Sequence, residues 1–174
     1  MLDMPRAASI IRACKKSGKV VTVKCRTGIK EDAMFAAEFA RMCEDAGADL
    51  ITIHGRSRSM MYDGIPYYEE IRLAKAAVSI PVIANGGIHS IASANQVMEE
   101  TGADGIMFGR YALENPFIIS KLTGTRYEKS FFETLLDQFE LALKFYTETY
   151  AINYVRKLAA NGMKKRKGTK KYKS

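Results

Sequence analysis

Two short apolar segments of the sequence end in glycines that stand beside polar residues. The segments read VIANGGI (82–88) and GIMFGR (105–110), and the positions of interest are Asn85, Gly86, Gly87, Gly109 and Arg110. Glycine has no side chain, so backbone N–H groups can approach an anion closely, and arginine adds a fixed positive charge. The paired segments predict a site for a phosphate-bearing ligand. The alternative is a simple tight turn with a solvated arginine nearby.

A lysine and a histidine stand in two other apolar segments. Lys24 lies in VTVKCR, where a buried ammonium group is costly without an anionic or carbonyl partner, so it is suited to face electron-rich ring atoms of a cofactor. His54 lies in IHGRSR and can hydrogen-bond a ligand or take part in acid–base chemistry, although an isolated histidine is more often structural. Spacing alone does not identify a reaction.

Alternating strand and helix patterns must position these residues. Short, mostly apolar, β-rich segments predict strands at 20–26, 49–55, 80–87 and 104–110. Segments rich in helix-forming residues predict helices at 5–18, 31–47, 67–78 and 90–102. This order predicts a parallel sheet, in which the carboxyl ends of the strands share one edge. We therefore expect the lysine, histidine, asparagine and arginine to converge there.

An internal repeat supports this order. AGADLITIHG (46–55) and TGADGIMFGR (101–110) align without gaps at an offset of 55, and each follows an earlier strand segment. Two such repeats make four βα modules, which is half of a (β/α)8 TIM barrel, whereas a complete barrel needs about 250 residues. The predicted fold class is therefore α/β, a partial TIM barrel of about the last four modules. Its unpaired outer strands predict self-association or pairing with a missing amino-terminal half.

The sequence changes character after the fourth strand. We expect the half-barrel to span residues 1–118, a small helical segment to span 119–163, and a basic tail to span 164–174. The chain carries a net charge of +8, and the tail contributes seven lysines or arginines and no acid, which leaves +1 elsewhere. Such a run can bind phosphate backbones, or it can be a solvated tail with no specific partner.

Composition excludes several classes of protein. A chain of 174 residues that is 47% apolar can bury a full core. No apolar run approaches the roughly 20 residues that a membrane helix needs, and the start does not resemble a signal peptide, so we expect a cytoplasmic protein. The three cysteines, Cys14, Cys25 and Cys43, match neither a disulfide framework nor a zinc pattern, and we interpret them as mostly packed, reduced thiols.

Taken together, the motifs resemble those of the bacterial type of tRNA-dihydrouridine synthase. They are VTVKCRTG, ITIHGRSRSMMYDG, IPVIANGGI, TGADGIMFGRYALENPFI and YVRKLAANGMKK, which cover about residues 20–118 and, more weakly, 150–165. The resemblance implies an FMN-binding α/β barrel followed by a helical RNA-binding domain. It also implies an oxidoreductase that uses NADPH and FMN to reduce uridine in tRNA to 5,6-dihydrouridine.

The resemblance further implies roles for individual residues. Lys24 would contact the flavin ring, and His54 would lie at the flavin and uracil site. The ribityl phosphate of FMN would be held by Asn85, Gly86, Gly87, Gly109 and Arg110. Contacts with RNA are implied for Arg56, Arg58, Arg156 and Lys157, the first two also being placed for the cofactor.

The sequence also departs from the family pattern. The early flavin-binding strands and the loop with the catalytic cysteine have no counterpart, so we expect the general-acid cysteine upstream of Met1 and assign its role to none of the three present. VRKL stands where the family tends to have Arg-Lys-His. The chain is then a carboxyl-terminal portion of a synthase that is inactive alone, or a noncatalytic half-barrel that retains phosphate, FMN or RNA binding. Another FMN or sugar-phosphate barrel is a third alternative.

Overall fold

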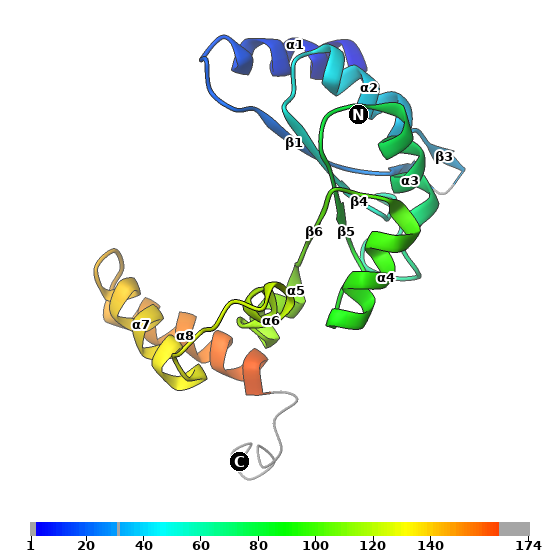
Figure 1. The fold of residues 1–174 in the computed structure, drawn as a ribbon. Coiled ribbons are helices and arrows are strands. Elements are labelled where there is room, and N and C mark those ends of the chain that lie inside the picture. The colour runs from blue at the N-terminus through cyan, green and yellow to red at the C-terminus, as the bar shows by residue number, and fades with distance from the viewer. Residues whose placement is uncertain (1–2, 31, 164–174) are drawn as a thin grey trace. The chain divides into compact units, whose positions relative to one another are not determined.

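The computed structural model describes residues 3–30 and 32–163, and the chain divides into two compact units, residues 1–109 and 110–174 (Figure 1). The first unit contains the main sheet, and the second is helical. This division falls before the boundary expected at residue 118, because helix α5 (Arg110–Glu114) packs against helix α8 (Glu148–Met163). The predicted tail, 164–174, lies outside the described residues.

The first unit is built on a parallel sheet of four strands in the order β1-β4-β5-β6. The strands are β1 (Thr22–Arg26), β4 (Leu50–His54), β5 (Val82–Asn85) and β6 (Gly105–Met107). The helices that alternate with them are α1 (Met4–Lys15), α2 (Ala36–Asp45), α3 (Tyr68–Ala77) and α4 (Ile91–Thr101). The predicted fold class, a four-module part of an α/β barrel, is confirmed.

The two faces of the sheet differ. The side chains of Ile51, Ile53, Val82 and Ala84 are fully buried and form the core beneath the helices, which lie along one side of the sheet (Figure 1). Side chains alternate between faces along a strand, so the residues between them point to the opposite, helix-free face. The strands pair in register at their carboxyl ends, where Arg26, His54, Asn85 and Met107 are successive neighbours. We call this helix-free side the inner face.

The internal repeat has a structural explanation at the opposite edge of the sheet. Asp49 accepts a hydrogen bond from the Val21 backbone N–H at 2.7 Å and pairs with Lys15 at the end of α1. Asp104, 55 residues later, accepts one from the Val82 N–H at 2.7 Å and lies 2.8 Å from the Lys75 ammonium. The hydrogen bonds from the paired lysine ammonium groups, followed by those from the backbone, lower the pKa of both carboxyls. Each repeated Gly-Ala-Asp therefore ties a strand to its neighbour.

The helix predicted over 31–47 begins later than expected. In its place, β2 (Gly28–Lys30) and β3 (Ala33–Met34) form a short antiparallel hairpin, and α2 starts at Ala36. The hairpin depends on Gly28, because any Cβ at that position would overlap the carbonyl group of Ala33. Sequence periodicity could not detect this approach of two backbones.

The second unit contains the predicted helical segment. Helices α6 (Ile118–Thr123) and α7 (Phe131–Leu143) join α5 and α8, and α7 packs against α8. Ser130 and Glu133 cap the start of α7 reciprocally, as in a capping box. The α7–α8 contact needs Gly162, because a Cβ there would overlap the Phe131 ring. Within the described residues, no helix is long and apolar enough to cross a membrane.

Candidate functional site

The predicted histidine and the Gly-Gly turn lie together at the carboxyl edge of the sheet. His54 ends β4 and is 8% exposed. Gly86 and Gly87 follow β5 with φ angles of +111° and +71°, which L side chains rarely adopt. A Cβ on Gly86 would lie 2.7 Å from His54 Cδ2, so this turn packs directly on the imidazole ring. The tertiary contact and the backbone both require glycine here.

The same turn presents backbone donors. Within the described part of the chain, no backbone carbonyl accepts a hydrogen bond from the N–H of Gly86, Gly87 or Ile88. Tyr68 supports the turn from behind, since its hydroxyl donates to the Gly86 carbonyl at 3.2 Å and lies where a Gly87 Cβ would be. Successive backbone N–H groups at positive-φ glycines form a concavity that suits an anion. The geometry of the turn therefore suits an anionic group such as a phosphate.

The other predicted phosphate residues have different surroundings. The Asn85 side-chain amide donates to the Met107 carbonyl at 2.8 Å and so ties β5 to β6. Gly109 has open space where a Cβ would stand and does not have a positive φ. Arg110 begins α5 and belongs to the second unit. The backbone conformation therefore requires glycine at positions 86 and 87, whereas at position 109 it does not.

Two cations share the inner face near this edge. Lys24 is exposed, and its position two residues before Arg26 places both on the same face. Partial desolvation lowers the pKa of Lys24, and the Arg26 charge lowers it further. Arg26, which sequence reasoning missed, donates from Nη1 to the carbonyls of Ser57 and Met61 at 2.8 and 2.9 Å. The two-residue strand period from Lys24 was the signal that would have identified it.

Arg56 holds the loop that follows β4. Its side chain is 8% exposed, and its Nε and Nη2 donate to the carbonyls of Asp63 and Gly64 at 3.0 and 2.8 Å. Its Nη1 lies 3.4 Å from His54 Nε2. A guanidinium group only donates hydrogen bonds, so in this pairing Nε2 is the only atom of the two that can accept. Arg58, in contrast, is exposed.

Replacing Arg56 with methionine is expected to destabilise the first unit by about 1–3 kcal/mol, because two loop carbonyls lose a charged donor. Cleavage by a broad-specificity protease should increase within residues 55–67. Arg58→Met removes an equal charge from an exposed position and serves as the matched control, with no more than about 0.5 kcal/mol expected. Urea unfolding and limited proteolysis measure both effects, and equal behaviour of the two variants would contradict this assignment.

The three cysteines lie away from the inner face. Cys25 faces the helices and is buried, which raises the pKa of its thiol to about 12. Cys43 is buried in α2, and burial raises its pKa to about 11. Cys14 is exposed on α1, so two of the three thiols are packed, in agreement with the expectation of mostly packed, reduced cysteines. None of the three has the position of a proton donor to a ligand on the inner face.

Parallel α/β proteins commonly have their ligand sites at the carboxyl ends of the strands, which is where this chain places a lysine, a histidine and a glycine turn. The sequence model of the family described as dihydrouridine synthase (Dus) matches residues 1–174. The chain belongs to the dihydrouridine synthase family.

Two individual tRNA-dihydrouridine synthases agree with this assignment. A probable tRNA-dihydrouridine synthase of Rickettsia conorii is 36% identical over 167 residues, which cover 90% of this chain and 50% of that protein. The tRNA-dihydrouridine synthase B of Vibrio cholerae is 46% identical over 102 residues, covering 59% and 32%. The solved structure of nitroalkane oxidase from Streptomyces ansochromogenes is 25% identical, with a TM-score of 0.44 over 62% of this chain and 31% of its own. The chain spans about half the length of the first curated relatives.

Proposed function

We propose that this chain supplies the carboxyl-terminal half of an FMN-dependent tRNA-dihydrouridine synthase, a cytoplasmic enzyme that reduces uridine in tRNA with NADPH. The observation that carries the proposal is the glycine turn with free N–H groups packed on His54, in a chain that belongs to this family. FMN supplies the redox chemistry when bound, and the protein supplies its position and the surrounding charge.

In this proposal the described residues have the following roles. The N–H groups of Gly86 and Gly87 hold the ribityl phosphate, and Arg110, the residue after Gly109, adds positive charge. Lys24 and His54 face the flavin and the uracil from the inner face. Arg56 positions the imidazole, and Asn85 keeps the ends of β5 and β6 together. Arg58, Arg156 and Lys157 are exposed cations and remain our candidates for tRNA contacts.

Lys24→Met is expected to weaken FMN binding about 10- to 100-fold, because a charged hydrogen-bond donor to the flavin is lost. Lys19→Met provides the control, since Lys19 is exposed and precedes β1 at the opposite edge of the sheet. Titration of flavin fluorescence measures both constants. Arg110→Ala should also weaken binding. Equal affinities for all variants and the unmodified chain would refute this cofactor site.

A further inference from the structure

The end of α7 and the start of α8 carry an exposed set of tyrosines that the cofactor site does not use. We call Tyr146, Tyr150 and Tyr154 the tyrosine ladder. The rings of Tyr146 and Tyr150 stack at 4.4 Å between centroids with 29° between planes, and those of Tyr150 and Tyr154 lie 6.5 Å apart at 9°. Their exposures are 56%, 50% and 37%, so large aromatic surfaces face solvent in an ordered array.

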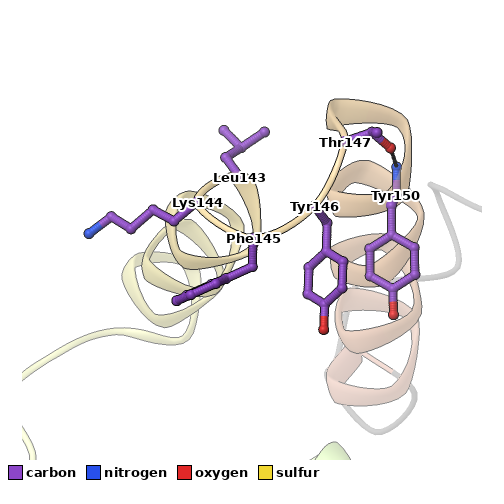
Figure 2. A pocket seen from close by; sticks show the side chains of 6 residues that line it. All are labelled: Leu143, Lys144, Phe145, Tyr146, Thr147 and Tyr150. Carbon is purple, nitrogen blue, oxygen red and sulfur yellow. Dashed lines mark hydrogen bonds between the residues drawn. The ribbon is translucent and has the colours of Figure 1, made fainter.

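The ladder borders two hollows on the α7–α8 hairpin. One is a cavity of about 220 Å³ to which all three tyrosines and Phe145 contribute. The other measures about 470 Å³ and is lined by Leu143, Lys144, Phe145, Tyr146, Thr147 and Tyr150 (Figure 2). Figure 2 shows the rings of Tyr146 and Tyr150 beside each other, with Lys144 and Phe145 on the α7 side. Phe145 is 74% exposed, so the aromatic surface extends beyond the ladder.

Positive charge stands at both ends of the ladder. Lys144 lines the larger hollow, and Lys157 follows Tyr150 by seven residues and Tyr154 by three, which places it on the same stripe of α8. Along the whole chain, too, the net positive charge is concentrated in the part that contains the tyrosine ladder. Residues 110–174 hold 14 basic and 6 acidic residues, a net +8, whereas residues 1–109 hold 13 of each and are neutral.

We propose that the tyrosine ladder binds unpaired nucleotides of an RNA strand. A base stacks on the exposed tyrosine surface, and the flanking phosphates lie near Lys144 and Lys157. Aromatic platforms interleaved with cations bind single strands in this way, because every base has a π-face and every nucleotide has a charge. The stacking requires base faces that a duplex hides. That the bound RNA is tRNA rests on the proposed function. Binding of an RNA strand to the tyrosine ladder requires no flavin.

The test uses the full 174-residue chain and a fluorescein-labelled oligouridylate of about eight nucleotides, with fluorescence anisotropy as the readout. Tyr150→Ala removes the central ring and is expected to weaken binding about 5- to 100-fold. Tyr150→Phe retains the ring and should bind within about twofold of the unmodified chain. Tyr127→Ala is the control, because Tyr127 is 49% exposed in the same unit and packs on Phe117 instead.

Salt dependence separates stacking from charge. Lys157→Gln should reduce the slope of log affinity against log salt concentration by about 0.7, whereas Tyr150→Ala should lower affinity and leave the slope unchanged. Light scattering monitors self-association, and circular dichroism checks the helices. Unchanged binding by Tyr150→Ala would overturn the proposal, as would an equal loss with Tyr150→Phe. A Tyr150→Ala variant that loses self-association and still binds RNA would instead assign the ladder to a second copy of this chain.

Discussion

Gly86→Ala is expected to destabilise the first unit by about 2–6 kcal/mol and to abolish measurable FMN binding. The first contribution is conformational. Gly86 has a φ of +111°, outside the regions open to alanine, and such a conformation costs about 1–3 kcal/mol when a side chain must adopt it. The turn can relieve this strain only by moving its N–H groups, which are the donors proposed for the phosphate.

The second contribution is steric. The new methyl group would lie 2.7 Å from His54 Cδ2 and 3.0 Å from Nε2. His54 is buried and contacts Arg56, so its ring cannot move into solvent without breaking that contact. Overpacking of this kind costs about 1–3 kcal/mol. The combined loss is a large fraction of the about 5–15 kcal/mol that stabilises an ordinary domain.

Two glycines of the same unit serve as matched controls for this substitution. Gly102 has a φ of +61° but open space around it, so Gly102→Ala isolates the conformational cost at about 1–2 kcal/mol. Gly109 has open space and no positive φ, so Gly109→Ala should cost no more than about 0.5 kcal/mol. The chain has no tryptophan, and urea unfolding is therefore followed by circular dichroism. If Gly86→Ala behaves like Gly109→Ala, the turn is not constrained as described.

A polypeptide of residues 1–174, given FMN, NADPH and unmodified tRNA, is expected to form dihydrouridine at least about 100-fold more slowly than the Vibrio cholerae relative assayed beside it. Reduction of uracil needs a hydride at C6 and a proton at C5, and the family resemblance assigns the proton to a cysteine. Loss of a positioned general acid costs about 10²–10⁴ in rate. Mass spectrometry of digested tRNA measures the product.

The positions of the thiols carry this prediction. Cys25 is the thiol nearest in sequence to Lys24, but it lies on the helix-covered face of β1 while Lys24 lies on the inner face. Cys43 is buried within α2, and Cys14 is exposed on α1. Comparable rates for this polypeptide and the relative would overturn the argument. Cys14→Ser, Cys25→Ala and Cys43→Ala would then show whether one of these thiols supplies the proton.

Much of the fold was predictable because it is encoded locally. Apolar β-rich runs, helical periodicity and the repeated Gly-Ala-Asp predicted the parallel strands and their order. Boundaries were less accurate. The predicted helix over 31–47 gave way to a hairpin at its start, since the approach of Gly28 to Ala33 leaves no periodic signal.

The sequence by itself determined the order of the βα modules, the glycines at the strand ends and the family, because each is carried by residues adjacent in the chain. Only the tertiary structure decided that Arg56 turns inward to its own loop and His54, and that Arg26 reaches Ser57. It also decided that Tyr68 supports the turn at Gly86 and that three tyrosines align on the α7–α8 hairpin. These contacts depend on where loops and helices place side chains that are distant in the sequence. A long polar or aromatic side chain can reach several partners, and the path of the backbone determines which one it contacts.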